Sequence, residues 1–82
     1  MAEIERIVFM QGDGADEALS RLDEEGIDGA LEYLKSWHYP GEHETSEETS
    51  AGTSDHTHET DDGYILTWNN RIGYIGLEYR VA

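Results

Sequence analysis

The chain has 82 residues, with 19 acidic side chains against 5 lysines and arginines, which gives a formal net charge of −14. This length predicts a single small domain over residues 1–82, and a surface this negative disfavours direct contact with nucleic acids or anionic membranes. The absence of cysteine excludes disulfides, thiolate nucleophiles and thiolate metal ligands.

The first predicted element is a strand over residues 4–10, which is rich in isoleucine, valine and phenylalanine and ends at Gln11-Gly12. Two short helices follow, because apolar residues recur with the i, i+3, i+4, i+7 spacing of one helix face. We expect Asp13 to cap the first helix, Gly26 to end it and Asp28 to cap the second. The apolar positions are Ala15, Ala18, Leu19 and Leu22, then Ile27, Ala30, Leu31 and Leu34. Two such helices predict a helical hairpin that covers one face of a sheet.

Residues 41–63 differ in composition from both of their flanks. They include eight acidic residues and no lysine or arginine, and Ala51 is their only aliphatic side chain. Such a segment buries too little apolar surface to offset the entropy lost on ordering, so we predict a flexible acidic loop that also carries histidines. An insert of this length in a compact domain is either functional or a tolerated linker.

The C-terminal residues alternate most clearly. Apolar side chains fall at every second position, at Tyr64, Leu66 and Trp68 before a turn and at Ile75, Leu77 and Tyr79 after it. A two-residue turn at Asn69-Asn70 or Asn70-Arg71 places both sets on one face, because side-chain direction has a period of two. Asparagine tolerates the positive φ of such turns. The predicted fold class is α+β, in the order β-α-α-(long acidic loop)-β-β, with about three antiparallel strands and the helical hairpin on one face.

Two patterns in the N-terminal half are similar to chemical sites. Gly12-Asp13-Gly14 precedes a helix as a phosphate-binding loop does, but Glu17 replaces the third glycine and nearby carboxylates repel phosphate, so we interpret it as a tight turn. Asp13 and Asp16 lack the other ligands of a calcium loop. The serines have no recognisable nucleophile setting, and acidic pairs such as Glu24-Glu25 lie on a solvated face. We therefore predict no enzymatic activity and no cofactor.

The histidines give one alternative function. His56 and His58 in an extended segment point to the same side, and His43 lies in the same acidic stretch. Three imidazoles and a carboxylate can complete a tetrahedral zinc shell, although zinc would have to order the predicted loop. His43, His56 and His58 are therefore the candidate ligands of a zinc-binding loop. His38, beside Trp37, is interpreted as a cation near a helix C-terminus.

Aromatic residues indicate a second kind of surface. By parity Trp68 faces the core, whereas Tyr74 lies on the opposite face of the sheet with Ile65 and Ile72. If the helices cover one face only, the other exposes an apolar patch suited to a protein partner or to a homodimer. The alternative is that the acidic loop or the N-terminal residues cover this patch.

The chain resembles a group of short uncharacterised acidic proteins in three segments. These are residues 31–37 (LEYLKSW), 64–69 (YILTWN) and 73–77 (GYIGL). In that group, an L-E-Y-L-x-x-W helix end precedes a variable acidic loop and a hairpin ending in G-Y-I-G-L. The resemblance covers about two-thirds of the chain and implies a shared fold, with no assigned activity or catalytic residues. By type alone, the small, acidic, cysteine-free chain is also similar to phage and plasmid inhibitors of the anti-CRISPR and antirestriction kinds.

The acidity has three explanations, of which we favour adaptation to molar salt, because Lys35 is the only lysine in the chain. The second is nucleic-acid mimicry by an inhibitor that blocks a DNA-binding protein, and the third is the zinc-binding loop. We predict a non-enzymatic protein-interaction domain, with a basic nucleic-acid-binding protein as one candidate partner. The predicted contact residues are Glu17, Asp23, Glu24, Asp28, Glu32, Trp68 and Tyr74. With no bilayer-spanning apolar run and no secretory signal pattern, we expect a cytoplasmic location.

Overall fold

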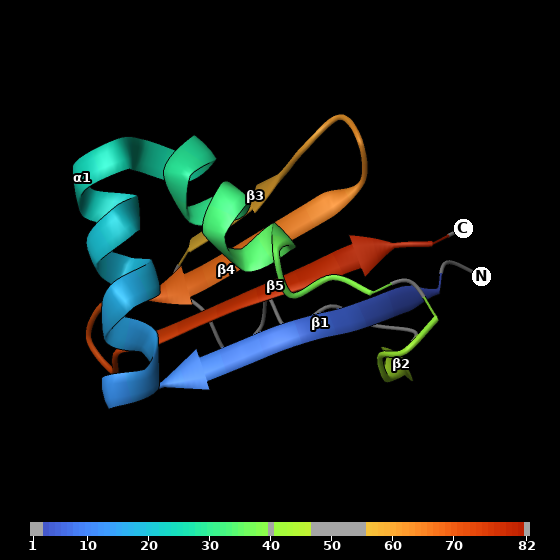
Figure 1. Cartoon of the computed structure of the whole chain (residues 1–82), viewed down its shortest axis with the longest axis horizontal. Helices are drawn as coiled ribbons and strands as arrows, with labels where there is room; N and C mark the ends of the chain where they lie inside the picture. Colours follow the sequence, from blue (N-terminus) through green and yellow to red (C-terminus); the bar gives the residue numbers. More distant parts are fainter. Residues whose placement is uncertain (1–2, 40, 47–55, 82) are drawn as a thin grey trace.

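The computed structural model describes residues 3–39, 41–46 and 56–81, which form an antiparallel sheet with helix on one side of it (Figure 1). The elements are β1 (Ile4–Gln11), α1 (Asp13–Lys35), β2 (Thr45–Ser46), β3 (His56–Glu59), β4 (Tyr64–Asn69) and β5 (Tyr74–Arg80). The strands lie in the order β2-β1-β5-β4-β3, and all neighbours are antiparallel. The predicted α+β class is confirmed, whereas the predicted count of about three strands is wrong, because the sheet has five strands within the described ranges.

The side chains of the β4–β5 hairpin lie on the predicted faces, but the turn is longer than predicted. Leu66 pairs with Leu77 and Trp68 with Ile75, so both predicted apolar sets share one face. The last pair is Asn69 with Tyr74, which leaves a four-residue turn where we expected two residues. Gly73, at φ 65°, supplies the positive φ, and no described non-glycine residue has one. The apolar pattern therefore correctly predicted a turn with an even number of residues. The prediction that asparagine supplies the positive φ is wrong, because Gly73 does so.

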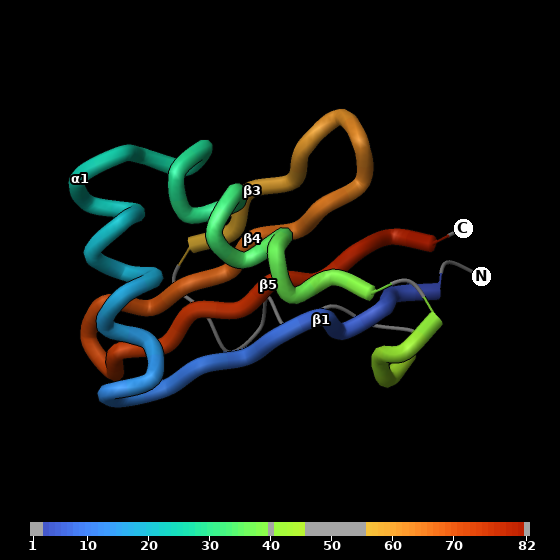
Figure 2. Tube along the Cα trace, in the orientation of Figure 1, coloured from blue at the N-terminus to red at the C-terminus, as the bar shows by residue number. Residues whose placement is uncertain are grey.

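Helix α1 begins and breaks near the predicted positions. Asp13 is its first helical residue, whereas Gly12 occupies the cap position and makes no side-chain cap bond, so the predicted Asp13 cap is wrong. Gly26, with φ 80° and ψ −171°, interrupts the helical backbone where we expected the first helix to end. The trace of α1 changes direction along its length (Figure 2), and residues of both segments contribute to one core. The buried residues of this core are Ile7, Ala15, Ala18, Ala30, Leu31, Leu34, Leu66, Ile75 and Leu77.

Within residues 41–63, the described parts are not a continuous loop. Strand β2 pairs with the start of β1, and β3 pairs with β4 along its whole length. The prediction of a loop over 41–63 is therefore wrong at both strands, and its middle part, 47–55, lies outside the described residues. Strand β3 has no aliphatic side chain and all its residues are exposed, so it is held by the backbone ladder and by edge contacts rather than by apolar burial.

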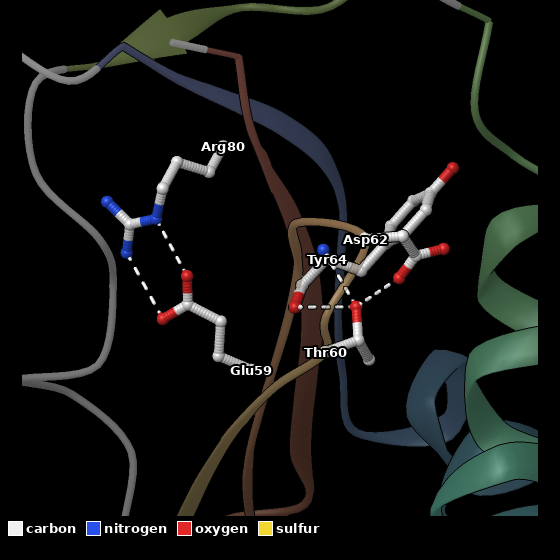
Figure 3. Close-up of polar contacts among 5 residues, drawn as sticks. All are labelled: Glu59, Thr60, Asp62, Tyr64 and Arg80. Atoms are coloured by element: carbon white, nitrogen blue, oxygen red, sulfur yellow. Dashed lines mark hydrogen bonds and ion pairs between the residues drawn. The ribbon is translucent and has the colours of Figure 1, made fainter.

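The β3–β4 connection illustrates these edge contacts (Figure 3). The Thr60 hydroxyl donates to the Asp62 carboxylate and accepts from the Tyr64 amide at 3.0 Å. Asp62 also lies 3.5 Å from Lys35 Nζ, which joins the turn to the end of α1. Arg80 of β5 reaches across β4 and binds both oxygens of Glu59 at 2.7 and 3.3 Å. That guanidinium, against the effect of partial burial, lowers the pKa of the Glu59 carboxyl below its ordinary value.

The sheet face away from the α1 core is also largely buried. Ile65 is only 1% exposed, so of the two alternatives, an exposed apolar patch and a covered one, the exposed patch is wrong for this residue. Tyr74 is half-buried and its ring stacks on Phe9 with centroids 6.0 Å apart, whereas Ile72 in the turn is exposed. None of the helical structure described is long and apolar enough to cross a bilayer.

Candidate functional site

The outward side of α1 carries a dense set of carboxylates. Its eight acidic side chains are all exposed, because the inward positions are taken by alanine and leucine. The predicted contact residues Glu17, Asp23, Glu24, Asp28 and Glu32 are among these eight. Arg21 lies 3.0 Å from Glu17 and 3.9 Å from Glu25, and its guanidinium also lies over the Tyr33 ring. This arginine therefore neutralises part of the negative charge of the first helical segment.

A pocket of about 190 Å³ opens where α1 meets the end of the β4–β5 hairpin. It is lined by Leu19, Leu22, Asp23, Trp68 and Asn70. The three helical residues have the i, i+3, i+4 spacing that places them on one stripe of the helix. The structure thus brings together Asp23 and Trp68, two of the predicted contact residues that are far apart in sequence.

Trp68 and Tyr74 do not share a surface. Trp68 is half-buried on the core side, as predicted, and its indole stacks on His56 of β3 with centroids 5.2 Å apart. Tyr74 lies on the other face, where it packs against Phe9. A single contact surface that contains both aromatics is therefore excluded by the alternation of the strands.

The candidate metal ligands are divided between two places. His56 and His58 pair with Trp68 and Leu66, so both lie on the same side of β3 as predicted. His43 instead lies beside His38, with ring centroids 5.9 Å apart, and its Nε2 accepts the Tyr39 amide at 3.2 Å. Among the described residues, no three acidic or histidine side chains are grouped so that they could hold a metal ion.

A buried polar chain links β1, the end of α1 and β4. His38 Nε2 lies 3.2 Å from Glu5 Oε2, and His38 Nδ1 lies 2.9 Å from the Tyr64 hydroxyl. The second Glu5 oxygen accepts the Gly41 amide at 3.0 Å. Both the Glu5 and the His38 side chains are less than a tenth exposed. His38 therefore has a buried structural position between Glu5 and Tyr64, and its predicted role as a cation near the helix C-terminus stays a prediction.

The protonation of this chain follows from its partners. Burial raises the pKa of the Glu5 carboxyl, but hydrogen bonds from His38 and the Gly41 amide outweigh it and lower the pKa below its ordinary value. The ionised Glu5 carboxylate accepts hydrogen bonds from His38 Nε2 and from the Gly41 amide, and the other ring nitrogen of His38 is hydrogen-bonded to the Tyr64 hydroxyl. Burial, reinforced by nearby Asp62, raises the pKa of the Tyr64 hydroxyl, so this phenol stays protonated.

Glu5 is not among the candidate site residues predicted from the sequence. In a strand with regular alternation, the Glu5 side chain would lie on the opposite face of the sheet from Val8 and Met10. A bulge between Arg6 and Val8 shifts the register, so that Glu5 pairs with Tyr79 and shares the face of Val8 and Met10. The only signal in the sequence is a carboxylate near the start of a mostly apolar strand.

No protein-family model, curated protein or solved structure matches this chain. The likeness to short acidic proteins carried by residues 31–37, 64–69 and 73–77 stays a prediction.

Proposed function

We propose that this protein is a non-enzymatic protein-interaction domain that binds a basic partner through the outer face of α1. The observation that carries the proposal is the exposure of all eight acidic side chains of this helix. Arg21 pairs with Glu17 and Glu25 in the first segment, and Lys35 pairs with Asp62 at the end. The carboxylates of Asp23, Glu24, Asp28 and Glu32, which we call the acidic face, lie around the break between the two segments.

Electrostatics favour a basic protein as the ligand of the acidic face. Like charges gathered on one element produce a local potential that attracts an oppositely charged surface and accelerates its association. Such binding weakens as salt screens the charges. A DNA-binding protein is one partner of this kind, because carboxylates can occupy the positions of phosphates, and binding would then inhibit that protein.

The test is affinity purification from the native cell at two salt concentrations, followed by binding measurements with each purified partner. The test variant neutralises the acidic face through Asp23→Asn, Glu24→Gln, Asp28→Asn and Glu32→Gln. The matched control neutralises four exposed acids outside α1, Glu3, Glu42, Glu44 and Asp61. Both variants lose four negative charges, so they differ in charge position and not in charge number.

We expect the acidic-face variant to bind the partner at least tenfold more weakly and the control variant to change it little. Equal loss in both variants means that net charge alone matters, and it contradicts a contact surface on α1. Addition of duplex DNA distinguishes the inhibitor function, because DNA displaces the protein only from a partner that uses the same site for both.

A further inference from the structure

The pocket between α1 and β4 combines an apolar floor with a polar rim. Leu19, Leu22 and Trp68 are half-buried, whereas Asp23 and Asn70 are exposed at its edge. Asp23 takes part in no ion pair or side-chain hydrogen bond with any residue of the described ranges. The rim therefore presents a carboxylate that is not neutralised by the described part of the chain, beside an indole ring and two leucines.

We propose that this pocket receives one arginine side chain of the basic partner, an inference that rests on the proposed function. The aliphatic stem of an arginine suits the surface of Leu19 and Leu22. Its guanidinium can pair with the Asp23 carboxylate through two N–H donors and lie against the Trp68 indole. The pocket volume of about 190 Å³ is large enough for one side chain and too small for most drug-sized ligands.

Charge and shape together favour arginine over other occupants. A leucine or phenylalanine side chain would cover Asp23 without pairing it, and desolvation of an unpaired carboxylate is unfavourable. A lysine ammonium can pair with Asp23, but it is a compact, strongly hydrated charge that lacks the planar donor pair and stacks less well on indole. Asp23 is itself a member of the acidic face, so the pocket rim is part of the proposed contact surface.

The experiment titrates the whole protein with three short blocked peptides, Gly-Arg-Gly, Gly-Lys-Gly and Gly-Leu-Gly, at constant ionic strength. The reporter is the Trp68 indole N–H signal in a ¹H–¹⁵N spectrum. Trp37, 46% exposed and outside the pocket lining, serves as the internal reference. We expect saturable movement of the Trp68 signal with the arginine peptide, and affinity about fivefold higher than for the lysine peptide, which corresponds to about 1 kcal/mol.

Two variants distinguish the pocket carboxylate from general negative charge. Asp23→Asn removes the carboxylate at the pocket rim, whereas Glu42→Gln removes one negative charge from an exposed residue outside α1 and outside the pocket lining. We expect the arginine response to fall at least fivefold in the first variant and to persist in the second. Equal affinity for arginine and lysine, a tighter leucine peptide, no movement of the Trp68 signal, or equal loss in both variants overturns the proposal.

The two proposals, arginine binding in the pocket and partner binding by the acidic face, can fail independently. If the acidic-face variant loses the partner while the Trp68 signal is unaffected by arginine, the domain binds a basic protein without an arginine in this pocket. If the peptide binds while partner capture is insensitive to the acidic face, the pocket exists and the proposed role of α1 is wrong.

Discussion

At the scale of single residues, Glu5 combines burial with ionisation. Its carboxylate accepts hydrogen bonds from His38 and the Gly41 amide, which hold the pKa of Glu5 below its ordinary value. We predict that Glu5→Gln lowers the free energy of unfolding near pH 7 by about 1–3 kcal/mol. The glutamine amide has one acceptor oxygen where the carboxylate has two, so either His38 Nε2 or the Gly41 amide would face an N–H donor and lose its acceptor.

The pH dependence of this effect has a definite sign. Because the folded pKa of Glu5 is lower than the unfolded one, ionised Glu5 stabilises the fold above the unfolded pKa. This stability is lost as pH falls through the folded pKa. Urea unfolding of the wild type and Glu5→Gln should therefore give a difference that is constant around neutrality and shrinks in acid. Glu3→Gln, which alters an exposed side chain, should change little, and a difference that grows in acid contradicts the assignment.

At the scale of elements, the direction of α1 depends on one backbone position. Gly26 has φ 80° and ψ −171°, a region essentially restricted to glycine, although a Cβ there would meet no atom within 4 Å. We predict that Gly26→Ala lowers the free energy of unfolding by about 1–3 kcal/mol through backbone strain alone. Gly14→Ala is the matched control, because Gly14 is helical and equally open, and it should stabilise by about 0.5–1 kcal/mol. Thermal unfolding monitored by circular dichroism measures both, and two changes of the same sign contradict the argument.

Among the elements, those that follow local periodicity could be predicted from the sequence, and those that depend on pairing with distant strands could not. The helix segments, the break at Gly26 and the faces of β4 and β5 follow local periodicity, and all were predicted. Strand β3 has no apolar alternation to reveal it, since it forms by pairing with β4. The bulge in β1 that brings Glu5 to His38 has no local sequence signature. For the candidate site, helical periodicity predicted the acidic face, whereas the pocket with Asp23 and Trp68 requires the tertiary packing of α1 on the hairpin.

At the scale of the whole molecule, the net charge of −14 acts on stability and on binding in opposite directions. In dilute buffer the carboxylates repel one another and weaken the compact state, and added salt screens that repulsion over shorter and shorter distances. The attraction between the acidic face and a basic partner is screened by the same ions. A protein of halophile-type composition is therefore expected to gain stability in the range of salt in which it loses partner affinity.

We predict that the thermal unfolding midpoint rises by several degrees between dilute buffer and about 1 M NaCl, because about 1 kcal/mol shifts a domain of this size by about 4–8 °C. The acidic-face variant, with four carboxylates neutralised, should rise less over the same range. A control variant neutralises Glu3, Glu42, Glu44 and Asp61. It distinguishes the effect of where the charges lie from the effect of their total number. If repulsion concentrated on α1 limits stability, this control should keep more of the salt dependence than the acidic-face variant does. A midpoint that is high in dilute buffer and insensitive to salt in all three proteins contradicts salt adaptation and leaves partner binding as the reason for the acidity.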